Sequence, residues 1–294
     1  MNNHMYKRRR KLKHFTIGDY MIYLVMALIC IIFIAPFIYV LSVSLTDPEV
    51  YVPYKLYLFP KKISLDTYKY ILSNPSFVNS LKNTVFITVV GTVLNLFITY
   101  TFAYVLTKKE MPFHKLFMGM VVFTMMFNVG IIPDFMMVKS LHLLNSRWAL
   151  ILPVLTNAWS LIVAKSFIES IPGEIEESAK IDGCNDIQVF LRMIIPLSKA
   201  SIATLTLFFA VSHWNAYFKA LVYLTDSNKR TLQVYVKSLL IDASTTGVGV
   251  DMMNMPSETV RMATVILAML PILAVYPFLQ KYFVKGAMVG AVKG

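Results

Sequence analysis

Long apolar runs, separated by short polar segments, dominate the sequence. Six of these runs contain no Asp, Glu, Lys or Arg, and they cover residues 20–45, 83–107, 116–133, 148–164, 200–218 and 262–280. Each is close to the roughly 20 residues that an α-helix needs to cross a bilayer. The pattern therefore predicts an all-α, polytopic membrane protein with six transmembrane helices.

The composition supports a membrane protein and excludes a soluble one. Hydrophobic residues make up 57% of the 294 residues, charged residues make up 15%, and the mean hydropathy is +0.62. A soluble chain of this length could not bury so much apolar surface. The net charge of +12 comes from scattered basic residues and one N-terminal cluster. It therefore indicates orientation in a membrane rather than nucleic-acid binding.

Basic residues beside the first two runs predict the orientation. Six lysines and arginines lie within residues 7–13, before the first run, and Lys108 and Lys109 follow the second. Because Lys and Arg concentrate in cytoplasmic loops, we expect the N-terminus in the cytoplasm, and six spans return the C-terminus to that side. A signal peptide is excluded because its apolar core would be only about 7–15 residues long.

This topology divides the chain into segments. They are a cytoplasmic basic N-terminus (1–19), a first transmembrane helix (20–45), an extracytoplasmic segment (46–82), a permease core of five helices (83–282) and a cytoplasmic tail (283–294). Within the core, residues 165–199 form a cytoplasmic loop, which we call the elbow, and residues 225–257 form an extracytoplasmic loop.

The elbow differs from its surroundings because it carries six acidic and four basic residues. It is predicted to hold two short helices. Pro172 and the following glutamates suit the start of the first helix, and Gly183 suits its end. Asn185 and Gln188 resemble a capping box for the second helix. That helix is expected to show one apolar stripe formed by Ile187, Phe190, Leu191, Ile194 and Ile195.

One motif in the elbow resembles a known family. Glu177-Ser178-Ala179, then Gly183, then nine residues, then Met193-Ile194-Ile195-Pro196 is similar to the EAA loop of ABC-importer permeases, which have the MetI-like fold. The resemblance implies the type I ABC importer permease fold and a coupling helix that contacts a separate ATPase. Its coupling residues map onto Glu176, Glu177, Ser178, Ala179, Asp182 and Gly183. An amphipathic connector that matches the motif by chance is the alternative.

The resemblance extends over nearly the whole chain. The segments at residues 131–153, 210–224 and 276–294 look like the carbohydrate branch of these permeases, and most like its LplC/YtcP-type polysaccharide permeases. That branch implies a second homologous permease subunit, a homodimeric ABC ATPase, an extracellular lipid-anchored solute-binding protein and a multi-pass location in the bacterial cytoplasmic membrane, in contact with lipid. It also implies a tail that contacts the ATPase through Val292, Lys293 and Gly294.

The sequence lacks the motifs of a self-powered transporter or an enzyme. It contains no G-x-x-x-x-G-K-[ST] loop for nucleotide phosphates, no G-x-S-x-G and no H-E-x-x-H. An ion-driven carrier usually needs carboxylates inside the bilayer, and the six runs have none. Cys30 and Cys184 lie in different kinds of segment, so neither a disulfide nor a metal site is expected. We therefore expect no cofactor on this chain, with ATP and Mg²⁺ bound by the partner ATPase.

Polar and aromatic side chains inside the runs are the candidates for a solute pathway. Neutral amides and aromatic rings suit the hydroxyls and C–H faces of sugars. The alternative is hydrogen bonding between helices, which contributes about 0.6–2 kcal/mol per contact in membranes. The candidates are Asn95, Asn128, Asn157, Trp159, His213, Trp214, Asn215 and Tyr217.

The expected function is that of a permease subunit of an ATP-driven importer for oligosaccharides or polysaccharide fragments. Two alternatives remain open at this point. One is an ABC permease for a peptide or a lipid precursor, and the other is an ion-driven secondary carrier.

The topology predicts which residues an impermeant thiol reagent reaches in intact cells. In a background without Cys30 and Cys184, Thr245→Cys should be labelled, whereas Lys7→Cys and Gly294→Cys should be labelled only after the membrane is permeabilised. Labelling of both terminal cysteines from outside would overturn the orientation.

Overall fold

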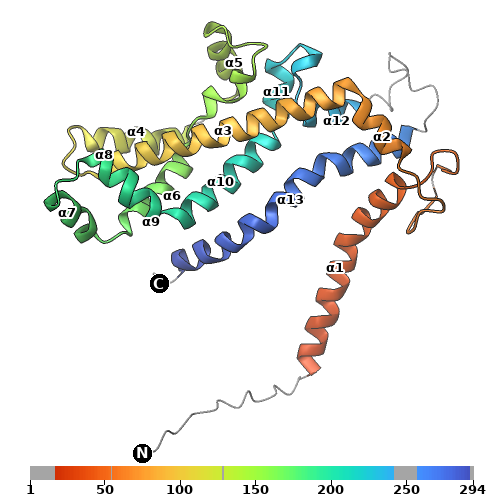
Figure 1. The fold of residues 1–294 in the computed structure, drawn as a ribbon, viewed down its shortest axis with the longest axis horizontal. Helices are drawn as coiled ribbons and strands as arrows, with labels where there is room; N and C mark the ends of the chain where they lie inside the picture. Colours follow the sequence, from red (N-terminus) through yellow and green to blue (C-terminus); the bar gives the residue numbers. More distant parts are fainter. Residues whose placement is uncertain (1–16, 54, 128, 242–256, 292–294) are drawn as a thin grey trace, which may run out of the picture.

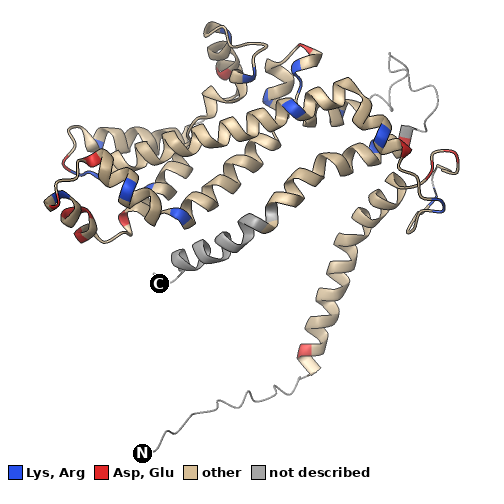
Figure 2. Cartoon of the chain, viewed as in Figure 1, with Lys and Arg blue, Asp and Glu red and all other residues tan. Residues whose placement is uncertain are grey.

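The computed structural model describes residues 17–53, 55–127, 129–241 and 257–291, and it describes the side chains of these residues except those of 241, 257, 276 and 278–291. This part of the chain is helical, with one isolated β-bridge between Thr46 and Ile63. An all-helical fold, as the apolar runs predict, is therefore confirmed. Figure 2 shows charged residues near the ends of the bundle, whereas the middles of its long helices are uncharged.

Figure 1 labels most of the helices and colours them in their order along the chain. They are α1 (Ile17–Ser44), α2 (Asp66–Ser73), α3 (Pro75–Thr107), α4 (His114–Met126), α5 (Ile131–Ser140), η1 (Arg147–Leu150), η2 (Leu152–Val154), α6 (Ala158–Glu169), α7 (Gly173–Ile181), α8 (Asp186–Val189), the π-helical turn η3 (Phe190–Ile194), α9 (Ile195–Leu197), α10 (Lys199–Trp214), α11 (Phe218–Tyr223), η4 (Ser227–Lys229), α12 (Leu232–Ile241) and α13 (Ser257–Ala291).

Three helices are long and apolar enough by themselves to cross a membrane, namely α1, α3 and α13. Two bent pairs also qualify if each counts as one span: η1 and η2 with α6, which meet at 52°, and α8 to α9 with α10, which meet at 80°. The described residues thus hold three to five candidate spans, together with the shorter apolar helix α4. The structure shows several apolar helices, and the prediction of six spans stays a prediction.

The third and fourth apolar runs are each divided between separate helices. In the third, α4 ends at Met126, and Gly130 takes a φ of +80° before α5 begins. In the fourth, the helical path breaks after Val154, and Asn157 is extended before α6. Asn157 Oδ1 accepts a hydrogen bond from the Ser160 N–H at 2.9 Å, so it caps α6. A capping side chain competes with the helix at this point, which hydropathy alone does not register.

The 33-residue helix α3 binds other elements of the core through one polar face. Thr84, Gly91, Asn95 and Thr99 recur at helical spacing along it. The Asn95 Nδ2 donates to the Val154 carbonyl at 2.6 Å, and the Thr99 and Thr156 hydroxyls lie 3.1 Å apart. These contacts bond the Val154 carbonyl and the Thr156 hydroxyl at the break before α6. The first of them stabilises a non-helical segment whose carbonyl would otherwise have no partner in the membrane.

The same face of α3 binds α10 through His213. The His213 Nε2 lies 3.0 Å from Asn95 Oδ1, and its ring packs against Gly91 so closely that a β-carbon there would lie 2.5 Å from Nε2. His213 is buried, with 5% of its surface exposed. Gly91 is therefore needed for the close approach of α10 to α3.

Replacing Gly91 should lower stability through this contact. Gly91→Ala forces the His213 ring to shift, at a cost of roughly 1–3 kcal/mol, so the purified protein should unfold at a lower temperature. Gly119→Ala is the matched control, because no heavy atom outside its own helix backbone and chain neighbours lies within 4 Å of the added carbon. In the Gly91→Ala background, His213→Ala should lower the free energy of unfolding by less than it does in the wild-type protein. Strictly additive losses of stability would contradict the contact.

Candidate functional site

The elbow has the local structure that its sequence predicts. The first helix, α7, ends where Gly183 takes a φ of +82°, and the Cys184 N–H donates back to the Ala179 carbonyl at 2.9 Å. Asn185 and Gln188 then exchange two hydrogen bonds of 2.9 Å, which form the predicted capping box at the start of α8. Gly183 thus supplies the backbone reversal that places α7 beside α8.

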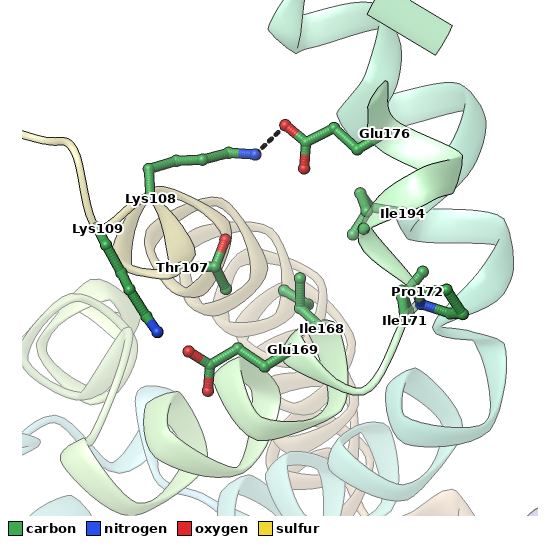
Figure 3. Close-up of a pocket in the computed structure, with 10 residues that line it drawn as sticks. Thr107, Lys108, Lys109, Ile168, Glu169, Ile171, Pro172, Glu176 and Ile194 are labelled. Atoms are coloured by element: carbon green, nitrogen blue, oxygen red, sulfur yellow. Dashed lines mark hydrogen bonds and ion pairs between the residues drawn. The ribbon is translucent and has the colours of Figure 1, made fainter. Parts of the chain in front are cut away.

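A chain of ion pairs attaches α7 to the end of α3. Lys108, the C-cap of α3, forms an ion pair with Glu176 (Figure 3). Lys180, one turn after Glu176, lies 3.1 Å from the same carboxylate and 3.2 Å from Asp186 of α8. Sequence reasoning placed Glu176 among the coupling residues but missed Lys108 as its partner. The nearest signal was the Lys108-Lys109 pair at the end of the second apolar run.

These lysines control the charge of Glu176. Burial would raise the pKa of the Glu176 carboxyl, but hydrogen bonds from Lys108 and Lys180 outweigh burial and hold the pKa below its usual value. Glu176 is therefore ionised at neutral pH. Its contribution to the α3–α7 contact is present above the ordinary pKa of a glutamate and is lost as the pH falls through the lowered value.

The residues of the family-like motif face in two directions. Ala179 is 3% exposed and packs into the core cluster with Val189 and Ile194, and Glu176 faces Lys108. Glu177, Ser178 and Asp182 are exposed on α7 and at its end, and so are Gly183 and the apolar side chain of Ile181. The inward side chains attach α7 to the bundle, whereas the outward ones form an exposed acidic surface with an apolar neighbour.

The apolar stripe predicted for the second elbow helix is wrong in two positions. Ile187 and Leu191 are exposed, at 70% and 57%, while Val189 is fully buried. The π-helical turn η3 shifts the helical register over residues 190–194, which include Leu191, whereas Ile187 lies before this turn. Pro196 follows this turn, and a proline has no N–H to donate to the helix.

A pocket of about 440 Å³ lies between the end of α3 and the link from α6 to α7 (Figure 3). Lys108 and Glu176 form part of its wall, and Ile171 and Pro172 line the link. The elbow is therefore attached to α3 here by the Lys108–Glu176 ion pair at the wall of this pocket.

The pathway candidates occupy several different environments. Asn157 caps α6, and Trp159 makes an edge-to-face contact with Phe208, with 5.1 Å between ring centroids. His213 belongs to the contact with α3, and Tyr217 packs against a buried cluster around Ile87. Their positions fit helix packing and capping. Asn128, Val292, Lys293 and Gly294 lie outside the described residues.

Trp214 and Asn215 lie beside open space. Trp214 is 5% exposed and borders two cavities, of about 220 and 190 Å³. Asn215 lines the smaller one, where its Oδ1 accepts a hydrogen bond from Gln233 Nε2 at 3.3 Å. Sequence reasoning missed Gln233 because it lies on α12, outside the predicted spans. Among the described residues, no group of three or more His, Cys, Asp or Glu side chains could hold a metal ion.

Comparison with known proteins gives a consistent result. The family model for the binding-protein-dependent transport system inner membrane component matches residues 8–289. The polygalacturonan/rhamnogalacturonan transport system permease protein YtcP of Bacillus subtilis (strain 168) is 45% identical, over 94% of this chain and 98% of its own. Protein LplC of the same strain is 46% identical, over 89% and 90%.

A solved structure is also similar. It is a chain in the crystal structure of a bacterial ABC transporter involved in the import of the acidic polysaccharide alginate. That chain is 33% identical, with a TM-score of 0.85 over 92% of this chain and 99% of its own. The likeness extends over nearly the full length of both chains.

Proposed function

The chain belongs to the family of binding-protein-dependent transport system inner membrane components, and we propose that it carries oligosaccharides or polysaccharide fragments across the bacterial cytoplasmic membrane. It is a permease subunit of an ABC importer and not itself an enzyme. The sugar assignment is supported by the polysaccharide named for YtcP and by the alginate transporter.

The observation that carries this proposal is that α7 of the elbow has one side in contact with the bundle and one exposed side. Glu177 and Ser178 are exposed on α7 and Asp182 at its end, and the opposite side of α7 is attached to α3. We propose that this exposed surface binds a homodimeric ATPase, which holds ATP and Mg²⁺. A carboxylate such as Glu177 would form a charge-assisted hydrogen bond with a cationic side chain of the ATPase. The tail at Val292, Lys293 and Gly294 is proposed as a further ATPase contact.

The remaining partners are inferred from the family and from the exposed apolar side chains of α1. A binding-protein-dependent system requires a solute-binding protein, which we propose is extracellular and lipid-anchored. The membrane-spanning window of α1 has none of its residues buried in the chain, and Figure 1 shows α1 diverging from the bundle. Its apolar side chains therefore need an apolar environment, which we propose is lipid together with a second, homologous permease subunit.

The topology completes the proposal. Five spans come from α1, α3, α13 and the two bent pairs, and we propose that the α4–α5 segment supplies the sixth as a broken span. Both termini and the elbow then lie in the cytoplasm. The N-terminal basic cluster and Lys108-Lys109 support this orientation through the positive-inside rule.

The ion-pair chain indicates how the ATPase would move the permease. When the two ATPase subunits close, they displace α7, and the pair between Glu176 and Lys108 transmits this displacement to the end of α3. Because α3 binds α10 and the break before α6 through its polar face, these elements move with it. The permease would thus alternate between inward-open and outward-open states.

Two substitutions in the elbow test this function. Gly183→Val should cost about 1–2 kcal/mol through left-handed strain alone, because no neighbour lies within 4 Å of the added β-carbon. Glu177→Lys should remove a charge-assisted contact worth roughly 1.5–3 kcal/mol. Both variants should insert normally but retain less ATPase and take up less substrate, as measured by uptake and ATPase co-purification at matched permease level.

Glu110→Lys is the matched control for the charge reversal. Glu110 is exposed on the same end of the bundle but lies outside the elbow, so this variant should transport normally. Full uptake with normal ATPase retention in both elbow variants would contradict the coupling role, and with it the main support for ATP-driven import by this chain.

A further inference from the structure

The segment that connects α1 to α2 closes on the end of α1. We call the described residues between 46 and 65 the outer loop, and Figure 1 shows it beside the end of α1 that leads into α2. Thr46 and Ile63 form an isolated β-bridge, and the Ser64 N–H donates to the Leu45 carbonyl at 3.0 Å. Both ends of the loop are therefore fixed to the last turn of α1.

The outer loop is folded around a tyrosine. Tyr57 is buried, and its ring stacks on that of Tyr51, with 5.5 Å between the ring centroids. The Tyr57 hydroxyl accepts a hydrogen bond from the Val52 N–H at 2.9 Å. These contacts define the conformation of the loop, so the directions of its exposed side chains follow from its own structure.

The side chains that the outer loop exposes are large and apolar. Leu56 and Phe59, which lie on either side of Tyr57 in the sequence, are 73% and 82% exposed. A loop in water is expected to bury its leucines before its tyrosine, and this loop does the reverse. An apolar surface of this kind marks a contact with another apolar surface. The other large apolar side chains that it exposes are Val52, Leu58, Ile63 and Leu65.

The length of α1 indicates where the outer loop lies in the membrane. The helix has 28 residues, which correspond to about 42 Å, and a bilayer with its headgroups is about 40–45 Å thick. None of the residues in its membrane-spanning window is buried within the chain. If α1 starts at the cytoplasmic surface, it therefore ends in the opposite headgroup layer. The outer loop, which is fixed to that end, lies in the same layer.

The polar residues of the outer loop suit this layer as well. Its cations are Lys55, Lys61 and Lys62, and residues 50–65 contain no Asp or Glu. A lysine side chain can extend from an apolar surface to lipid phosphates, and tyrosine is enriched at the boundary between lipid and water. Interfaces between proteins are instead depleted of lysine. The composition of the loop therefore favours a lipid surface over a protein surface.

We propose that the outer loop inserts Leu56, Leu58 and Phe59 into the outer leaflet of the membrane and anchors the extracytoplasmic end of α1. Lipid acyl chains cover these three side chains, while Lys55 and Lys61 bind lipid phosphates. Such an anchor sets the depth and tilt of α1. This inference uses the proposed topology, but it does not depend on the identity of the solute.

The test is quenching of a fluorescent probe by lipid in the complete importer. Bimane is attached to Phe59→Cys in a background without Cys30 and Cys184, in nanodiscs whose lipids carry a nitroxide on the acyl chain close to the headgroup. The nitroxide should lower the emission at least about threefold, because an inserted side chain contacts the acyl chains. Aqueous iodide should have little effect, and addition of the binding protein should change neither result.

Two further probe positions are the controls. Phe37→Cys, on the exposed surface of α1 before its extracytoplasmic end, should also be quenched by the nitroxide. Ser76→Cys should be quenched by iodide instead. Ser76 is exposed and precedes the second apolar run by seven residues, which correspond to about 10 Å of helix.

A double variant tests whether the apolar side chains hold the loop in the membrane. With the probe on Leu58→Cys, replacement of Leu56 and Phe59 by Ser should restore most of the emission in nitroxide-containing nanodiscs. Both side chains are exposed, so this variant keeps the contacts of Tyr57. Ile132→Ser is the matched control, since Ile132 is also exposed but lies on α5, and it should leave the quenching unchanged.

Four outcomes would overturn the anchor. Quenching of the Phe59→Cys probe by iodide and not by the nitroxide would place the loop in water. Shielding from both quenchers would show that the second permease covers it, and shielding that appears only with the binding protein would identify that protein as the partner. If the Phe37→Cys probe is not quenched by the nitroxide, the proposed position of α1 in lipid fails together with the anchor. Uptake measured on the same samples shows separately whether the transport function stands.

Discussion

A buried backbone group must find a hydrogen-bond partner inside the protein when the surroundings are lipid, and the arrangement of this permease depends on that constraint. The break after Val154 frees a carbonyl in the middle of an apolar run, and Asn95 of α3 binds it. Asn95 also binds His213, which brings α10 against Gly91. One polar face of α3 therefore makes the broken span possible and fixes the position of the neighbouring helix.

The same helix connects the elbow to the cavity beside Trp214. Near the end of α3 that leads into α4, Lys108 holds Glu176 of the elbow. Near its other end, the Thr84 hydroxyl accepts a hydrogen bond from the Leu232 N–H at the start of α12, at 2.7 Å. Gln233, the next residue, lines the cavity beside Trp214. A displacement at the elbow can thus reach the cavity through one rigid element, in which each contact is a named hydrogen bond or ion pair.

Much of this structure could be predicted from local sequence signals. Charge-free runs identified α1, α3 and α13, and the chemistry of Gly183, Asn185 and Gln188 identified the elbow, because such signals act within a few residues. The third apolar run contains Asn128 and Gly130, which mark the break before α5, but the sequence did not reveal the break before α6, since apolar composition continues through it. It also did not reveal the register shift at η3 or the pair between Lys108 and Glu176, which joins residues 68 positions apart. Long-range contacts of this kind depend on tertiary packing, as does the contact between Gln233 and Asn215.

The central claim is that an ATPase acting on the elbow drives solute through this chain. The most direct measurement is oligosaccharide uptake into vesicles that contain the complete importer, with ATP supplied on the elbow side and all ion gradients collapsed by ionophores. The account predicts uptake that requires ATP, the ATPase and the binding protein and that persists without ion gradients. Uptake that continues without the ATPase and stops when the ion gradients collapse would contradict it.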